Sequence, residues 1–272
     1  MNLSLALKAA QQAASAAGEL IRNRFPRSGR PPLEIHHKGR IDLVTEVDLA
    51  SEQCIRSILL EHFPHHQILG EEGGVQGEAG TPRWIVDPLD GTRSFAHGYP
   101  FVSVAIALEW QHQLQLGLVY DPLREEMFWA TRGGGSFLNG EPIRVSAAAD
   151  LSQALLVSGF PYQLAEIDSE PLFALFKEFV LRSGGIRRDG SAALDFCYVA
   201  CGRLDGFWEF FLKPWDGAAG ALIVEEAGGI VSDFSGRPFD PYRAEMVATN
   251  PALQKQMLEL AQPYLEGIRR WL

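Results

Sequence analysis

The segment Trp84–Phe95, with the sequence WIVDPLDGTRSF, most constrains how this chain can fold. Three apolar residues lead into a segment that carries two carboxylates, so the pattern predicts a strand that runs into a tight turn. Pro88 fixes one backbone angle, and Gly91 permits a conformation that residues with a Cβ atom resist. The chain is therefore expected to reverse sharply here, with its acidic side chains held close to the end of a strand.

The same segment suggests two kinds of binding. Asp87 and Asp90 supply the hard oxygen ligands that Mg²⁺ prefers. If the amides of Gly91 and Thr92 begin a helix, they would form a pocket for an anion. A simpler interpretation is that the two aspartates only cap a turn, as aspartate often does. If the segment binds both Mg²⁺ and an anion, it places a divalent cation and a phosphate group side by side.

Composition sets outer limits on function. The chain has 272 residues and a formal net charge of -10, which argues against a surface that coats nucleic acid. The Ala-rich segment Leu3–Leu20 has helical periodicity and predicts an amphipathic helix rather than a signal peptide. No stretch is apolar and long enough to cross a bilayer. Three cysteines cannot all pair with one another and fit a reducing compartment, so we expect a cytoplasmic protein with no membrane partner.

Periodicity and turn residues predict a mixed α and β chain. An antiparallel meander is expected from Phe101 to Val145, with turns at Asp121-Pro122 and Asn139-Gly140. The connection from Gly73 to Arg83 is rich in glycine and is expected to be mobile. Further strands are expected near residues 68–72, 154–159, 205–211 and 229–233. Helices are expected near residues 3–24, 171–182, 192–201, 217–227 and 251–265, with one ending near His62 and capped by Thr45 or Asp48.

Acidic residues follow several of the apolar runs. Glu71 and Glu72 end one run, Asp87 and Asp90 another, and Asp216 precedes a small, apolar segment. Acids in such positions are expected at the mouth of a sheet, where the four carboxylates of Glu71, Asp87, Asp90 and Asp216 could hold more than one Mg²⁺. In the simpler interpretation, Asp216 is the N-cap of a helix that begins at Gly217.

These residues resemble the motifs of the inositol monophosphatase family of Mg²⁺-dependent, lithium-sensitive phosphatases. The resemblance rests on seven segments that occur in the family's order: Asp42–Asp48, Gly70–Glu72, Asp87–Thr92, Gly190–Asp195, Gly202–Glu209, Trp215–Gly220 and Glu226–Gly229. It implies a layered α-β-α-β-α sandwich, of the α/β (α+β) class, that forms a homodimer. It also implies one domain over residues 1–272, with an N-terminal lobe at 1–147 and a C-terminal lobe at 148–272.

The resemblance assigns roles residue by residue. Glu71, Asp87 and the carbonyl of Leu89 would hold a first Mg²⁺, and Asp87, Asp90 and Asp216 a second, with a weaker third helped by Glu71. Glu71 and Thr92 would activate the attacking water, with Asp48 hydrogen-bonded to Thr92. The amides of Gly91 and Thr92 would bind phosphate oxygens. The alcohol part of the substrate would contact Ser191, Ala192, Glu209 and Asp216.

The expected reaction is hydrolysis of a small phosphomonoester, with inositol-1-phosphate first. Inositol phosphatases often have Thr-Asn where this chain has Arg93-Ser94, and basic residues occur there in relatives with other substrates. Histidinol phosphate, a sugar bisphosphate and 3′-phosphoadenosine phosphate are the alternative substrates. An alternative of another class is a regulatory protein that keeps the fold and binds a partner.

Several other residues have less specific explanations. Lys38 could be an active-site lysine, and Arg187 and Arg188 could meet a second phosphate, a subunit contact or surface acids. The histidines near Pro64, His97, and the pair Cys197 and Cys201 are more simply explained by solvation or packing. The aromatic residues are expected in the core or a dimer interface rather than in a base-stacking platform, since no basic groove accompanies them. They are Phe207, Trp208, Phe210 and Phe211.

Overall fold

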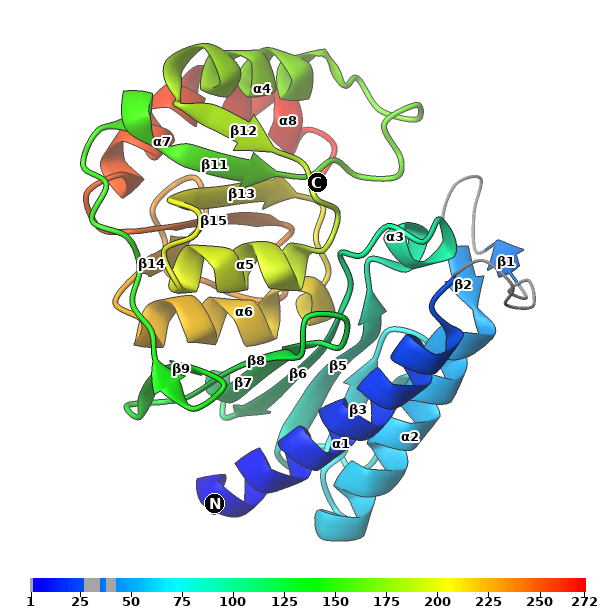
Figure 1. Cartoon of the computed structure of the whole chain (residues 1–272). Coiled ribbons are helices and arrows are strands. Elements are labelled where there is room, and N and C mark those ends of the chain that lie inside the picture. Colours follow the sequence, from blue (N-terminus) through cyan, green and yellow to red (C-terminus); the bar gives the residue numbers. More distant parts are fainter. Residues whose placement is uncertain (1, 27–34, 38–42) are drawn as a thin grey trace.

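Five layers alternate between helices and sheets in the structure, a computed structural model that describes residues 2–26, 35–37 and 43–272 (Figure 1). Lys38 and Asp42, which were singled out in the sequence, lie outside the described residues. The order of the layers is helix, sheet, helix, sheet, helix, which confirms the predicted sandwich. The division into lobes at residue 147 stays a prediction.

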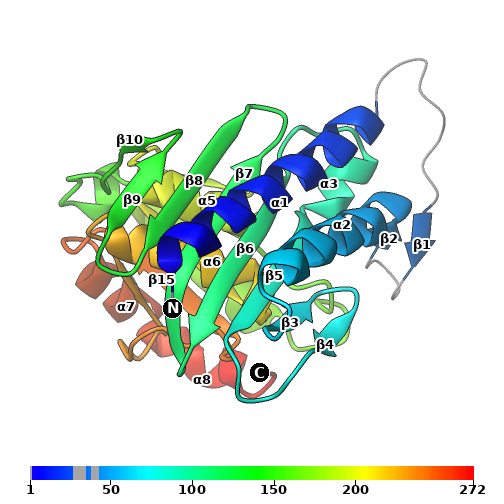
Figure 2. The same cartoon turned by 90° about the horizontal axis from the view of Figure 1, so that it is seen from below.

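The first sheet has eight strands and carries two long helices on its outer face. Its strands stand in the order β10-β9-β8-β7-β6-β5-β3-β4. Helices α1 (Leu3–Arg24) and α2 (Glu46–His62) lie across that face side by side (Figure 2). The strands are β3 (Gln67–Gly70), β4 (Gly74–Gln76), β5 (Arg83–Asp90), β6 (Ser103–Trp110), β7 (Gln113–Asp121), β8 (Glu126–Thr131), β9 (Gly135–Leu138) and β10 (Glu141–Pro142). A short antiparallel pair, β1 (Ile35–His37) and β2 (Leu43–Thr45), precedes α2.

Helices α5 (Ala192–Ala200) and α6 (Pro214–Glu226) form the middle layer and separate the two sheets (Figure 1). The second sheet has five strands in the order β12-β11-β13-β15-β14. These are β11 (Leu155–Ser158), β12 (Gly185–Arg187), β13 (Gly206–Phe210), β14 (Ile230–Ser232) and β15 (Glu245–Thr249). Helices α4 (Glu170–Arg182), α7 (Gln254–Ala261) and α8 (Leu265–Arg269) cover its outer face.

Side-chain alternation along the strands explains how one chain fills three separate cores. On β5, Trp84 and Val86 pack under α1 and α2, while Ile85 faces the middle layer. On β13, Phe207 faces the middle layer, while Trp208 packs against the outer helices. Successive side chains of a strand point to opposite faces, so strands that are apolar at nearly every position serve two cores at once. Phe207, Trp208 and Phe210 are all buried, which confirms the prediction that they belong to the core.

Small residues allow α6 to lie close to the first sheet. A Cβ atom added to Gly117 on β7 would lie 2.3 Å from the carbonyl oxygen of Ala219. Ala105 and Ala107 on β6 share the same core with Ala218 and Ala219. The close approach fixes the depth at which α6 sits, and therefore the position of its N-terminal turn.

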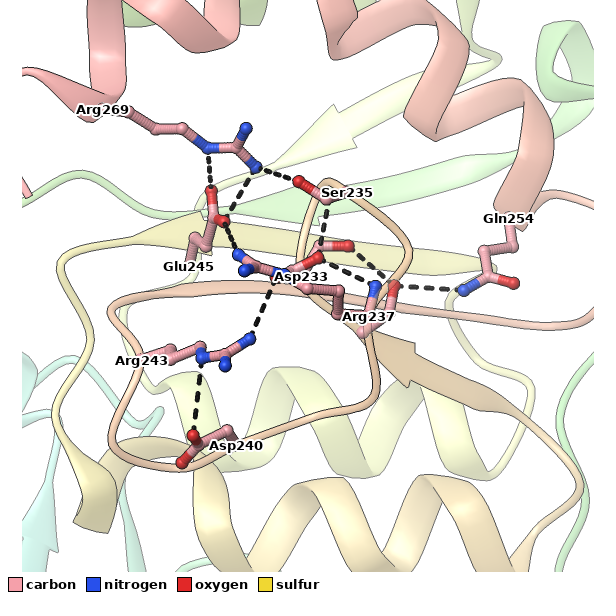
Figure 3. Close-up of polar contacts among 9 residues, drawn as sticks. Asp233, Ser235, Arg237, Asp240, Arg243, Glu245, Gln254 and Arg269 are labelled. Atoms are coloured by element: carbon pink, nitrogen blue, oxygen red, sulfur yellow. Dashed lines mark hydrogen bonds and ion pairs between the residues drawn. The ribbon is translucent and has the colours of Figure 1, made fainter.

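The C-terminal helix is tied to the second sheet by charged groups that Figure 3 shows in detail. The guanidinium of Arg269 donates to both carboxylate oxygens of Glu245 on β15, at 3.0 and 2.9 Å, and to Ser235 at 2.8 Å. Asp233, which follows β14, accepts from the amides of Ser235 and Arg237 at 2.8 and 3.0 Å. These contacts attach α8, in the outermost layer, to the second sheet on the side opposite the middle helices.

The structure corrects four expectations about secondary structure. The segment after Gly73 is not only a connection, because β4 pairs with β3 in antiparallel register. Helix α6 begins at Pro214 rather than at Gly217, so Asp216 lies in its first turn instead of being its N-cap. The expected C-terminal helix begins at Gln254 and is interrupted at Pro263 by a 3₁₀ turn, because proline cannot donate the required hydrogen bond. The strands β12 and β15 were not expected.

Other expectations are confirmed. The N-terminal helix and the meander of β6, β7 and β8 lie where the sequence placed them. Thr45 caps α2, and Asp48 completes a capping box with it. Within the described residues, no helix has the length and apolar character needed to span a membrane.

We predict that Gly117→Ala lowers the free energy of unfolding by about 1–3 kcal/mol, because the added methyl group meets the Ala219 carbonyl in a closely packed interface. Gln115→Ala on the same strand is the control and should change stability by less than about 0.5 kcal/mol. Urea denaturation measures the free energy of unfolding of both variants and of the wild-type protein. Equal stabilities would contradict the close approach of α6 to β7.

Candidate active site

One extra residue in β5 brings two carboxylates to the same face of the first sheet. Asp87 pairs with Ala105 on β6, and Asp90 pairs with Ser103, so two residues of β5, Pro88 and Leu89, oppose one of β6. In a regular strand, residues three apart point to opposite faces. The bulge at Pro88 and Leu89 removes this difference, so both aspartates point toward the middle layer.

Glu71 joins them through the parallel pairing of β3 with β5. Gly70 is in register with Val86, and the amide of Glu71 donates to the Val86 carbonyl at 3.2 Å. The next residue pair in this register is Glu71 and Asp87. The two carboxylates therefore lie at the same edge of the sheet, as the sequence predicted.

Asp216 approaches from the middle layer. Its Oδ2 accepts a hydrogen bond from the Lys213 amide at 2.6 Å, which fixes the side chain in the first turn of α6. Burial, and after it Asp90 and Glu71, raise the pKa of Asp216. The structure thus brings together all four carboxylates that the sequence proposed as a group.

Asp90 is held by the first turn of α5. Its Oδ2 accepts from the Ser191 hydroxyl at 2.6 Å and from the Ala193 amide at 2.8 Å. Ser191 also caps α5, and its hydroxyl lies 3.2 Å from that of Ser103. Ser191 and Ala192, predicted to contact substrate, therefore border Asp90 and line the same cavity.

The turn after Asp90 requires glycine. Gly91 has φ of 88°, and a Cβ atom there would lie 2.8 Å from the Phe101 carbonyl oxygen.

Thr92 then begins the short helix α3 (Thr92–Ala96). Its hydroxyl lies 2.8 Å from Asp48 Oδ1 and 3.0 Å from the Leu89 carbonyl. Asp48 is buried at the start of α2, where Oδ2 also accepts from the amide and hydroxyl of Thr45.

Burial raises the pKa of the aspartates in this group, and neighbouring carboxylates add to the rise for Asp87 and Asp216. Asp87 is only 2% exposed, and burial, then Glu71, Asp90 and Asp216, raise its pKa well above the ordinary value. Burial likewise raises the pKa of Asp90 to about 6, although Ser191 and the α5 amides oppose the rise. Concentrated negative charge of this kind is costly unless a cation balances it.

The donor chemistry of this group fits Mg²⁺. All four side chains offer hard oxygen atoms, and the Leu89 carbonyl lies beside them in the bulge. Among the described residues, no three His, Cys, Asp or Glu side chains are already arranged to enclose a metal ion. The charges of Glu71, Asp90 and Asp216 nevertheless act on Asp87, so these carboxylates lie near one another without forming a closed cage.

A cavity of about 290 Å³ opens beside these acids. Glu71, Asp90 and Asp216 line it, together with Glu209 and Arg188. Burial raises the pKa of Glu209 to about 8, while the charge of Arg188 opposes the rise. Aromatic side chains complete the wall: Phe160, Tyr162, Phe210, Phe211 and Trp215. The lining of the cavity thus combines acidic, basic and aromatic side chains.

The residues of the cavity wall that the sequence analysis missed include Asp195 and Tyr162. Asp195 on α5 is 2% exposed, its Oδ1 has no hydrogen-bond partner, and burial followed by the Glu209 charge raises its pKa. Tyr162 lies in the loop after β11, and the guanidinium carbon of Arg93 is 5.3 Å from its ring centroid. The helical spacing of Asp195 from Ser191 could have revealed the first, but nothing in the loop sequence signals the second.

The remaining sequence candidates lie elsewhere or have structural roles. His66 stacks on Phe63 with ring centroids 4.7 Å apart, beside Trp84. Arg187 and His97 are exposed and do not line the cavity, whereas Arg188 does. Cys54, Cys197 and Cys201 are free thiols.

Comparison with known proteins agrees with this geometry. The inositol monophosphatase family matches residues 2–266, which is nearly the whole chain. This chain belongs to the inositol monophosphatase family. It is 36% identical to the structure of an inositol monophosphatase from Anabaena, with a TM-score of 0.86 and 100% of both chains covered.

Two curated relatives carry different kinds of name. The chain is 45% identical to Nus factor SuhB of Pseudomonas aeruginosa over 263 residues, covering 95% of this chain and 96% of the relative. It is 41% identical to Phosphatase IMPL1, chloroplastic, of Arabidopsis thaliana over 245 residues, covering 88% of this chain and 66% of the relative. One relative is thus named as a phosphatase and the other as a factor.

We predict that Asp195→Asn makes the chelator-treated protein more stable at pH 8. The folded pKa of Asp195 is raised, so its favourable contribution is complete at low pH and is lost as pH rises through that value. Asparagine resembles the protonated form, so the advantage of the variant should shrink toward pH 4. Glu259→Gln on the exposed face of α7 is the control. A pH-independent difference in urea denaturation would contradict the prediction.

Proposed function

We propose that this protein is a phosphatase that hydrolyses a small phosphomonoester with Mg²⁺ bound at Glu71, Asp87, Asp90 and Asp216. The observation that carries the proposal is the bulge in β5, which turns Asp87 and Asp90 to one face, opposite the first turn of α6. Membership of the inositol monophosphatase family supports the same chemistry. We propose two or three Mg²⁺ ions in each active site.

Bound Mg²⁺ would supply positive charge to the phosphate and lower the pKa of a coordinated water. The chain's own groups would orient the reactants. When the Thr92 hydroxyl donates its proton to Asp48, its lone pairs remain available to accept a hydrogen bond from water. Glu71, at the same edge, would take the proton of that water. The amides of Gly91 and Thr92 would hold phosphate oxygens.

The alcohol part of the substrate would lie in the cavity beside these carboxylates. Glu209, Ser191 and Ala192 line that region, together with Asp216. A carboxyl group and a hydroxyl group suit the hydroxyl groups of a polyol. Inositol-1-phosphate is therefore the substrate that we propose first, with histidinol phosphate, a sugar bisphosphate and 3′-phosphoadenosine phosphate as alternatives.

Other proposed properties come with the family resemblance. We expect lithium to inhibit the reaction, two copies of the chain to associate, and the protein to work in the cytoplasm. The net charge of -10 remains unfavourable for nucleic acid as a partner.

We predict that Asp90→Asn lowers phosphate release more than about a hundredfold. Replacing a group that only supports a metal ligand commonly lowers metal affinity or activity 10–100-fold, and replacing a ligand itself should lower activity further. The assay compares inositol-1-phosphate with the three alternative substrates in Mg²⁺. Asp233→Asn, at a buried aspartate outside the cavity lining, is the control. If the wild-type protein releases phosphate from no substrate, the proposal fails.

A second prediction concerns the hydroxyl of Thr92. Thr92→Val keeps the shape of the side chain but removes its hydrogen bond to Asp48, so kcat should fall about 10²–10⁴-fold. Thr92→Ser keeps the hydroxyl and should retain most activity. Steady-state kinetics distinguish the two variants, and equal loss of kcat in both would contradict a role for the hydroxyl.

The relatives named Nus factor SuhB favour a second candidate function, regulation through a protein partner. The two functions differ in their need for the carboxylates. If Asp90→Asn abolishes phosphate release but fully retains the protein's function in cells, the partner role is favoured. Loss of both together favours the phosphatase.

A further inference from the structure

We propose that Glu52, a residue of α2 outside the expected metal ligands, positions Glu71 by holding the turn that follows it. The inference rests on the proposed function, because it gives Glu52 a role in metal binding. Glu52 would touch neither metal nor substrate. It would act through the backbone.

The evidence begins with two hydrogen bonds from the turn to one carboxylate. Glu52 Oε2 accepts from the Glu72 amide at 2.8 Å, and Oε1 accepts from the Gly73 amide at 2.8 Å. Glu52 is only 4% exposed, so these amides replace water as its partners. Hydrogen bonds to an ionised, buried acceptor are stronger than those between neutral groups. Both amides belong to residues directly after Glu71.

Two glycines make room for this carboxylate. A Cβ atom on Gly70 would lie 2.4 Å from Glu52 Oε2, and one on Gly73 would lie 2.5 Å from Oε1. Neither glycine has a positive φ, so backbone conformation does not require them. Their absence of a side chain is explained by the carboxylate that lies between them. Helix α2 and the turn are therefore fitted to each other through Glu52.

The same contacts fix Glu71 from both sides. Before it, Gly70 is in register with β5, and the Glu71 amide donates to Val86. After it, Glu52 holds Glu72 and Gly73. Arg56, one turn along α2, lies 3.4 Å from Glu52 and also bonds Gln76 on β4. A carboxylate with both flanking backbone segments held needs little reorganisation to bind a cation.

The proposal is tested by measuring Mn²⁺ binding in the absence of substrate, with the EPR signal of the free ion as the readout. Mn²⁺ takes the same oxygen ligands as Mg²⁺. Glu52→Ala removes the two hydrogen bonds, and Gly73→Ala displaces the carboxylate without removing it. Both should weaken Mn²⁺ binding about 10–100-fold. Glu52→Gln keeps one acceptor oxygen and should have an intermediate effect. In each variant, the KM for substrate at saturating metal should change less than the Mn²⁺ affinity.

Asp233→Ala is a matched control. Asp233 is also a buried carboxylate that accepts from two amides of one turn, but it lies after β14, beside the charged contacts between Arg269 and Glu245 (Figure 3). This variant should lower the melting temperature as Glu52→Ala does, yet leave Mn²⁺ affinity unchanged. A purely structural role for Glu52 predicts no difference between the two variants in metal binding.

The outcomes separate this inference from the proposed function. If the wild-type protein binds Mn²⁺ and the Glu52 and Gly73 variants bind it equally well, only the role of Glu52 is overturned. If the wild-type protein neither binds Mn²⁺ nor releases phosphate, both proposals fall. Weakened binding in both variants, with the control unchanged, supports the positioning role.

Discussion

The bulge at Pro88 and Leu89 is the constraint on which the rest of the candidate site depends. In a regular strand, Asp87 and Asp90 are three residues apart and would point to opposite faces of the first sheet, so that one would enter the core beneath α1 and α2. Proline favours this irregularity because it has no amide hydrogen to give to the ladder. Gly91 then completes the turn in a conformation that brings Thr92 back beside Asp48.

The layered fold brings three independent chain segments to this bulge. The parallel neighbour β3 delivers Glu71, α6 delivers Asp216, and α5 holds Asp90 through Ser191. The three aspartates have backbone or hydroxyl partners, yet burial raises the pKa of each, and neighbouring carboxylates add to the rise for Asp87 and Asp216. A fold that concentrates unbalanced carboxylates in this way gives up stability unless a cation is bound. This physical cost is the strongest structural reason to infer a metal site.

The sequence predicted the layered fold and the acids that meet, because apolar runs ending on acids and the family motifs are both legible in it. It did not predict the bulge, since a spacing of three residues in a strand implies opposite faces. Short strands such as β12 (Gly185–Arg187) contain too few residues to show alternation. Glu52 was overlooked although it lies four residues after Asp48, on the apolar face of α2. Its partners are amides, which leave no signature in a sequence.

The position of bound metal tests the central claim most directly. Crystals grown with Mn²⁺ in place of Mg²⁺ would locate the ion by its anomalous scattering. We expect strong peaks among the carboxylates of Glu71, Asp87, Asp90 and Asp216, close to the Leu89 carbonyl. Well-diffracting crystals that show no peak there at millimolar Mn²⁺, or peaks only on surface carboxylates, would contradict the assignment of this cluster as the metal site.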